Sequence, residues 1–163
     1  MSGDERLDAE QLAAYFTLTE VGSLLEQAVA QQLRDEGDLS PVQFQILAGL
    51  GSVPGNAERM TDIADRIVYS RSGVSYQAGQ LEQRGLITRA PAPDDERSTL
   101  VRLTDAGRAL LDHVMPGHVA LVKRLMFDVM PASGLADLQR SLGPVRDRLR
   151  EAPPRSARPR SRR

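Results

Sequence analysis

The sequence predicts a mainly α fold with one small β-hairpin, an α+β class. Two observations support this prediction. Apolar residues recur at spacings of three and four over most of the 163 residues, and strand-like runs occur only between residues 86 and 103. A chain of this length is the usual size of one domain and can bury its own core. We therefore expect one domain over residues 1–152 and a disordered Arg/Pro-rich tail over residues 153–163.

The first two helices are predicted from apolar stripes and terminal residues. Residues 8–35 have an apolar stripe at helical spacing, with acids and glutamines on the other face, and Gly37 is expected to end this helix. The second helix has Ser40 as its N-cap and Pro41 in its first position. Gln43 in the third position can complete a capping box with the serine.

Two shorter helices follow. We expect Thr61 to cap the third helix, and a fourth helix to begin after residues 69–73 and to end at Gly85 as its C′ glycine. The residues expected to face the core are Ile63, Ala64, Ile67 and Val68 in the third helix, and Val74, Ala78 and Leu81 in the fourth.

A hairpin and two further helices complete the chain. Residues 86–90 and 99–103 are β-prone, and residues 91–98 read as a long, charged tip stiffened by proline. Thr104 is expected to cap a fifth helix that runs to about residue 130, with a bend near Pro116.

The last helix follows Pro131, with Ser133 as a candidate cap. Its apolar residues alternate steps of three and four, which is the narrow seam that a helix presents to a partner helix. They are Leu135, Leu138, Leu142, Val145 and Leu149. Such a seam packs either within one subunit or between two, and we favour a homodimer because the first helix offers a second free apolar face.

Composition excludes several classes of function. The chain has no cysteine, and its two histidines, His113 and His118, lack a standard zinc spacing, so we expect no metal site and no thiol chemistry. No nucleophile–base pair or phosphate loop is recognisable, so we expect neither an enzyme nor a cofactor. No apolar run is long enough to span a bilayer, and the acidic N-terminus argues against a signal peptide, so we expect a cytoplasmic protein without a membrane partner.

Charge is unevenly distributed along the chain. Residues 1–38 carry nine acids and two arginines, whereas residues 66–89 carry four arginines and one acid, Glu82. The arginine-rich segment covers the fourth helix, whose polar residues are suited to reading base edges. They are Ser70, Arg71, Ser72, Ser75, Tyr76, Gln77 and Gln80. Two short helices and a hairpin with a local positive charge predict a winged helix-turn-helix lobe that binds double-stranded DNA.

The sequence around this lobe resembles the MarR (multiple antibiotic resistance regulator) family. The resemblance lies in Leu-Glu-Gln-Arg-Gly-Leu-Ile from residue 81, Asp-Glu-Arg from residue 95, and Val-Arg-Leu-Thr-Asp-Ala-Gly from residue 101. It implies a winged helix-turn-helix lobe over residues 40–104. It also implies dimerisation helices over residues 8–36 and 105–150.

The resemblance also implies roles for wing residues. Arg97 would reach the minor groove, and Asp95 would brace the wing tip by pairing with an arginine, Arg97 itself being the candidate. We add Arg89, at the base of the wing, to the expected DNA contacts. Two departures leave alternatives open: Gln77 either reads a base or loosens packing, and Gly79 makes the reading helix either flexible or open to close backbone approach.

Many members of this family bind small, often aromatic molecules between the dimerisation helices and the DNA-binding lobe. The candidate ligand residues are Tyr15, Phe16, Phe44 and His113, each of which is also readable as ordinary core. The resemblance thus implies a homodimeric repressor of a pseudopalindromic operator, released by a small effector. The alternative is a dimer that binds DNA without sequence preference or binds only protein. The sequence names neither the operator, the effector nor the regulated genes, and it does not separate repression from activation.

Overall fold

The computed structural model describes residues 6–151, so the predicted disorder of the C-terminal tail falls outside the described residues. The structure is mainly helical with one small antiparallel sheet, which confirms the predicted fold class. The chain divides into two compact units between Leu121 and Val122. The elements are α1 (Ala9–Gly37), α2 (Pro41–Ser52), a 3₁₀ turn (Pro54–Asn56), β1 (Ala57–Arg59), α3 (Met60–Arg66), α4 (Arg71–Gln83), β2 (Ile87–Ala92), β3 (Asp95–Leu103), α5 (Asp105–Val122), a π-helical turn (Lys123–Phe127) and α6 (Gly134–Glu151).

The start of α2 is as predicted. The Gln43 backbone N–H donates to Ser40 Oγ at 3.2 Å, and the Ser40 backbone N–H donates to Gln43 Oε1 at 3.0 Å. Pro41 occupies the first helical position, where the missing N–H costs no hydrogen bond. A second capping box, formed by Asp8 and Gln11, begins α1.

The end of α1 differs from the prediction. Gly37 is the last helical residue, and the left-handed C-cap is Asp38, with φ 49°. A Cβ built on Gly37 would lie 2.7 Å from Val114 Cγ1 in α5. The glycine therefore allows close packing against α5, and the aspartate provides the turn that ends the helix.

The third helix begins two residues earlier than predicted. Its N-cap is Arg59, without a side-chain cap, and Thr61 lies inside the helix, so the predicted threonine cap is wrong. Val68 was also expected inside but is 87% exposed, because α3 ends at Arg66 and its helical spacing does not continue. Ile67, by contrast, is buried.

The end of α4 is as predicted. Gly85 adopts φ 71°, its backbone N–H donates to the Glu82 carbonyl at 2.9 Å, and the Leu86 N–H donates to the Leu81 carbonyl at 3.0 Å. These two bonds form a Schellman motif. The predicted buried residues of α4, which are Val74, Ala78 and Leu81, are all fully buried.

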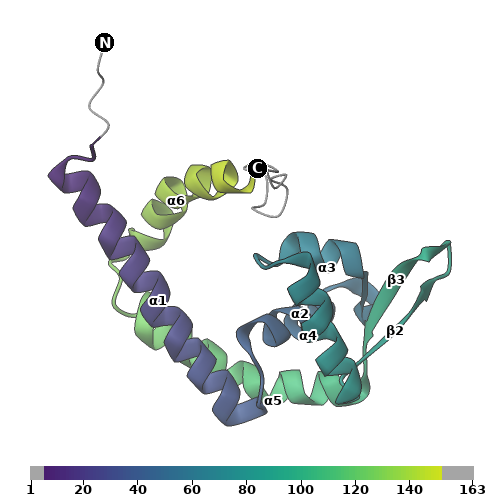
Figure 1. Ribbon diagram of the computed structural model, residues 1–163. Helices are drawn as coiled ribbons and strands as arrows, with labels where there is room; N and C mark the ends of the chain where they lie inside the picture. The colour runs from purple at the N-terminus through teal and green to yellow at the C-terminus, as the bar shows by residue number, and fades with distance from the viewer. Residues whose placement is uncertain (1–5, 152–163) are drawn as a thin grey trace, which may run out of the picture. The chain divides into compact units, whose positions relative to one another are not determined.

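The sheet has one strand more than predicted, in the order β1-β3-β2. The short strand β1 pairs with residues 100–102 of β3. The predicted long hairpin loop is wrong, because β2 and β3 extend through most of it and leave only Pro93 and Asp94 as the connection (Figure 1). Pro91 is tolerated because β2 is an edge strand, and the register shifts next to it.

Thr104 caps α5 as predicted, since its Oγ1 accepts the Gly107 N–H at 3.0 Å. The helix continues through Pro116 but ends at Val122, before the predicted end, and a π-helical turn follows. The core of the first unit lies between α2, α3, α4, the sheet and the inner face of α5. Its fully buried large residues are Leu33, Leu39, Ile46, Leu47, Leu50, Ile63, Val74, Leu81, Ile87, Val101 and Val114.

Candidate nucleic-acid interface

The first turn of α4 is fixed by Ser70. Its Oγ accepts the Gly73 backbone N–H at 3.1 Å and lies 3.5 Å from Ser72 Oγ. The Tyr69 ring packs over this turn, because a Cβ on Gly73 would lie 2.3 Å from Tyr69 Cε1. The Ser70 hydroxyl, which was predicted to contact DNA, therefore also caps the helix, and the amino end of α4 has a defined geometry.

The outward face of α4 carries most of the predicted reading residues. Ser72, Ser75 and Tyr76 are exposed, and the Tyr76 residue is 64% exposed. Gln77 and Gln80 are half-buried, so they present less of their amides to a ligand than the sequence suggested. The face is narrow, polar and bordered by one aromatic ring, which suits the base edges of a major groove.

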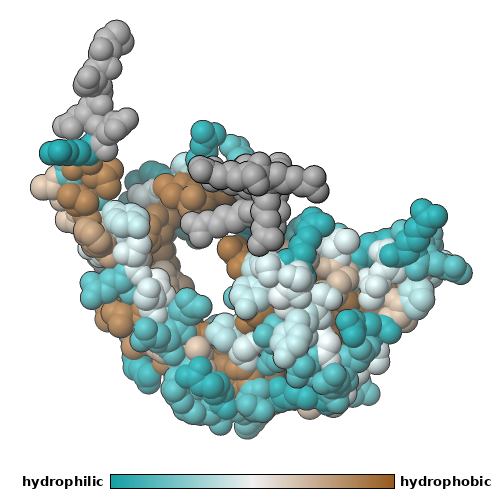
Figure 2. Space-filling model, in the orientation of Figure 1, coloured by the Kyte–Doolittle hydropathy of each residue, from teal (hydrophilic) through white to brown (hydrophobic). Residues whose placement is uncertain are grey.

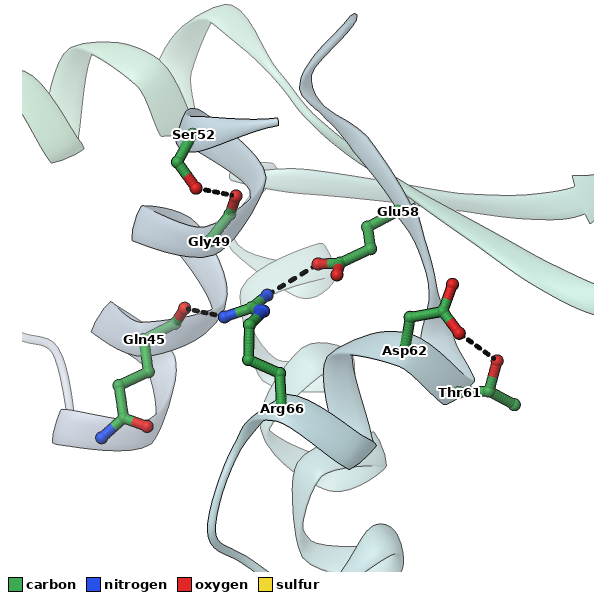
Figure 3. Close-up of polar contacts among 7 residues, drawn as sticks. All are labelled: Gln45, Gly49, Ser52, Glu58, Thr61, Asp62 and Arg66. Carbon is green, nitrogen blue, oxygen red and sulfur yellow. Dashed lines mark hydrogen bonds and ion pairs between the residues drawn. The ribbon is translucent and has the colours of Figure 1, made fainter. Parts of the chain in front are cut away.

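The positive charges near α4 are largely engaged within the protein. Arg66 donates to Glu58 Oε2 at 2.7 Å and to the Gln45 carbonyl at 3.3 Å (Figure 3). Its guanidinium occupies the space of a Cβ on Gly49, which ties α3 to α2 and β1. Arg66 therefore stabilises the lobe in this structure, although it is one of the four arginines of the positively charged segment, residues 66–89.

Two of the predicted DNA-binding arginines form ion pairs. Arg71 Nη2 lies 2.7 Å from Asp65 Oδ1, with both side chains mostly exposed. Arg89 Nη2 lies 2.6 Å from Glu82 Oε2, which joins β2 to α4. The hydrogen bond from Arg89 lowers the pKa of Glu82, against a smaller opposing effect of burial. DNA would therefore compete with Asp65 for Arg71 and with Glu82 for Arg89.

The wing tip is braced differently from the expectation. Asp95 Oδ1 accepts the backbone N–H of Arg97 at 3.0 Å, whereas the aspartate–arginine pair of the wing is Asp94 with Arg59, at 2.5 Å. Asp95 thus orders the Arg97 backbone without holding its guanidinium. Within residues 6–151, the Arg97 guanidinium forms no ion pair, and the residue is exposed. Its charge is available to a ligand.

The predicted ligand residues do not lie in one place. Phe44 is buried, and the ring beside it belongs to His118, at a centroid distance of 4.5 Å, rather than to His113, which is exposed. Tyr15 and Phe16 pack edge to face with each other at 5.5 Å and are more than half exposed on α1. The predicted set therefore separates into a buried phenylalanine, an exposed aromatic pair and an exposed histidine.

Two polar atoms that the sequence did not single out lie near α5. Gln32 Oε1 and His118 Nδ1 are buried and have no hydrogen-bond partner among the described residues. Gln32 Nε2 donates to Glu36 Oε2 at 2.8 Å and to the Val114 carbonyl at 3.2 Å. Burial lowers the pKa of His118. Helical spacing alone gave no signal for either residue, because their surroundings come from other helices.

A metal site or a membrane span would each require a recognisable feature within residues 6–151. No group of three or more histidine, aspartate or glutamate side chains there is arranged to hold a metal ion. None of the helices in that range is long and apolar enough to cross a membrane.

Comparisons with known proteins agree with this geometry. PecS, an HTH-type transcriptional regulator from Dickeya dadantii (strain 3937), is 32% identical over 114 residues, which is 69% of this chain and 68% of PecS. AbsC from Streptomyces coelicolor has a TM-score of 0.87 at 29% identity, covering 91% of this chain and 99% of AbsC. Sco3205 from the same organism, solved in complex with DNA, has a TM-score of 0.82 at 29% identity and 96% coverage of both chains.

The matched region includes the lobe described above. The family model described as the MarR family matches residues 37–98, from the last residue of α1 to the wing. The chain spans 59% and 61% of the length of two other curated regulators that it matches. The winged helix-turn-helix fold, the sequence match and the similar solved structures together establish that the chain belongs to the MarR family of transcriptional regulators.

Proposed function

We propose that the protein is a homodimeric repressor that binds a pseudopalindromic DNA operator in a sequence-specific way. The observation that carries this proposal is the pairing of two surfaces on one lobe. The face of α4 with Ser72, Ser75 and Tyr76 suits the major groove. The wing holds an exposed Arg97, which has no ion pair with any residue between 6 and 151 and suits the narrow minor groove. Sco3205, which has a similar fold, was solved in complex with DNA. The protein would act in the cytoplasm, where its DNA target lies.

Exposed apolar residues support the dimer. Hydrophobic surface lies along α1 (Figure 2), and six of its large apolar residues are between 40% and 62% exposed. They are Leu12, Tyr15, Phe16, Leu18, Val21 and Leu24. In α6, Leu135, Val145 and Leu149 are also exposed. Apolar surface of this extent on helices is typical of an interface between copies of a chain.

A small effector would act near Phe44. The buried ring of Phe44 offers an apolar contact, and the adjacent His118 ring offers a polar anchor. Gln32 Oε1, which has no hydrogen-bond partner within residues 6–151, offers a second polar anchor. A small aromatic molecule with a hydrogen-bonding group fits this chemistry. It would release DNA only if it bound one conformation of the lobe more tightly than the other.

Competition and sedimentation test the proposal. The purified protein first selects a duplex from random DNA, and its affinity for that duplex is measured in excess nonspecific DNA. A specific regulator retains the duplex, whereas an architectural binder loses it, and a protein-interaction module selects none. Sedimentation at micromolar concentration is expected to give about twice 17.8 kDa. A folded monomer under these conditions would rule out the two-fold model.

A further inference from the structure

Arg84 links the recognition helix to the end of α1. It is the C-cap of α4, and its guanidinium donates from Nη1 to the Asp38 carbonyl at 2.7 Å and from Nη2 to the Gly37 carbonyl at 3.0 Å. These acceptors are the last residue of α1 and its C-cap. The planar fork of an arginine fits two neighbouring carbonyls, whereas a lysine is a single point charge.

The end of α1 is itself firmly held. Leu33 and Leu39 are 0% and 1% exposed, and the Leu39 N–H donates to the Leu33 carbonyl across the turn. Gly37 packs against Val114 of α5, and Gln32 donates to the Val114 carbonyl. Arg84 therefore joins α4 to a fixed point of the lobe.

The other part of α1 is exposed. Most residues before Leu25 are exposed, including the apolar residues assigned above to the dimer interface. One helix therefore carries the proposed interface at its amino end and the Arg84 contact at its carboxyl end. A change in how α4 meets this end would change how the two recognition helices of a dimer are placed.

We propose that Arg84 is a positioning residue that sets the half-site spacing that the dimer accepts. The inference rests on the proposed function, because spacing has a meaning only for a dimer on two half-sites. One base pair changes the separation by about 3.4 Å and the orientation by about 35° around the DNA axis. Two hydrogen bonds that hold α4 against α1 reduce the freedom of the helix to follow such a change.

The test uses the whole 163-residue chain and the duplex that the wild type selects, with one base pair inserted between the half-sites or removed. The wild type is expected to lose about tenfold or more in affinity at either altered spacing, as for a mismatched base pair. Arg84→Ala is expected to bind the three spacings within about threefold of one another. Arg84→Lys keeps the charge and loses the planar fork of the guanidinium. Its preference for the original spacing is expected to lie between that of the wild type and that of Arg84→Ala.

Arg102→Ala is the matched control. Arg102 donates to the Gly55 carbonyl at 2.8 Å, so this variant also removes one exposed arginine and a bond to a backbone carbonyl, without touching α1. It is expected to keep the wild-type spacing profile. Thermal melting of each variant verifies that the lobe is folded.

Three outcomes overturn the inference. If Arg84→Ala retains the wild-type spacing profile, Arg84 is not a positioning residue, and the dimeric repressor stands. If Arg84→Ala is equally weakened at every spacing and its salt dependence is flatter, Arg84 is a phosphate contact. If the wild type itself has no spacing preference, the two-half-site function fails together with the inference.

Discussion

Glu82 and Arg89 join the recognition helix to the base of the wing. Nε and Nη2 of Arg89 donate to Glu82 Oε2 at 2.9 and 2.6 Å, and the Arg89 backbone N–H donates to Glu82 Oε1 at 3.1 Å. Both carboxylate oxygens are therefore used, one for the guanidinium and one for the strand backbone. In this structure, Arg89 orients the wing instead of extending into solvent.

Glu82→Gln tests this link. The substitution removes the charge from a partly exposed pair, so we expect a loss of a few tenths to about 1 kcal/mol in the free energy of unfolding at pH 7. Arg89 lowers the pKa of Glu82 below 4.5, so the charged pair stabilises the folded state fully above pH 4.5. That stabilisation is lost as the pH falls through the lowered pKa. Urea unfolding of both proteins over this range is the measurement.

The control for this prediction is Glu96→Gln, on the exposed part of the wing. It is expected to leave the stability almost unchanged at every pH. A Glu82→Gln variant that differed from wild type by the same amount at pH 7 and well below pH 4.5 would contradict the assignment of the effect to the charged pair.

Substitution of two glycines by alanine is expected to change the stability of the protein in opposite directions. Gly37→Ala places a methyl group 2.7 Å from Val114 Cγ1, and overpacking of this kind costs about 1–3 kcal/mol. A Cβ built on Gly79, inside α4, would have Arg89 Nη2 as its nearest neighbour, at 3.8 Å. This distance leaves room for a methyl group. Gly79→Ala is therefore expected to stabilise the protein by about 0.5–1 kcal/mol, because glycine is a poor helix former. Chemical unfolding of both variants decides this.

DNA affinity adds a second result for Gly79. Its Cβ position lies toward Arg89 of the wing base, so we expect Gly79→Ala to bind the selected duplex as the wild type does. A stable Gly79→Ala variant with weakened binding would mean that DNA approaches the α4 backbone closely at this position, one of the two alternatives that the sequence left open.

Features fixed by local chemistry were predictable from the sequence. The capping box of Ser40 and Gln43, the Thr104 cap and the C′ conformation of Gly85 depend on residues within a few positions of one another. The buried face of α4 followed from its spacing. The family motif placed Arg97 on the wing, where the structure leaves its guanidinium without an ion pair among residues 6–151.

Features fixed by distant residues were not predictable. The strand β1 has only three residues and exists because β3 pairs with it. Asp94 pairs with Arg59, which is 35 positions away, and neither residue carries a local signal for the other. His118 contacts Phe44 through the packing of α5 on α2, and no local pattern in the sequence indicates this contact.

His118 predicts a pH dependence of stability. Burial lowers its pKa below 6.5, so the folded state disfavours the charged ring. The unfolded chain then binds more protons than the folded one, and stability is expected to fall as the pH drops from about 6.5 through the lowered pKa. His118→Leu removes the titrating group and is expected to reduce this part of the pH dependence. Unfolding midpoints measured between pH 8 and pH 5 test the expectation.

His113→Gln is the matched control, because His113 is exposed on the same helix. It is expected to retain the wild-type pH dependence. If both histidine variants behaved like the wild type, the loss of stability at low pH would come from other groups, and protonation of the half-buried His118 would have no measurable effect on stability.

Arg97 and Arg71 are expected to affect DNA binding in different ways. Arg97 has no ion pair within the described residues, so its full charge is available to the minor groove. Arg97→Ala is expected to weaken binding to most DNA sequences. The slope of the logarithm of the binding constant against the logarithm of the salt concentration is expected to become shallower by about one unit. Arg71, at the start of α4, has its Nη2 2.7 Å from Asp65 Oδ1, so DNA competes with that carboxylate for its guanidinium.

The result for Arg71 depends on what it contacts in the groove. If Arg71 binds a phosphate, Arg71→Ala also weakens binding to all sequences. The loss is smaller than that for Arg97→Ala, because the wild-type Arg71 contact is offset by the cost of weakening its ion pair with Asp65. If it binds a guanine, the loss is about 1–3 kcal/mol and falls at one operator position. Affinities for a set of single-base operator variants at two salt concentrations distinguish these results. Arg148→Ala, which removes an exposed arginine of α6, is the control for loss of charge.

Wild-type affinity in Arg97→Ala would show that the wing does not contact DNA, and the lobe would then resemble a DNA-binding domain in fold alone.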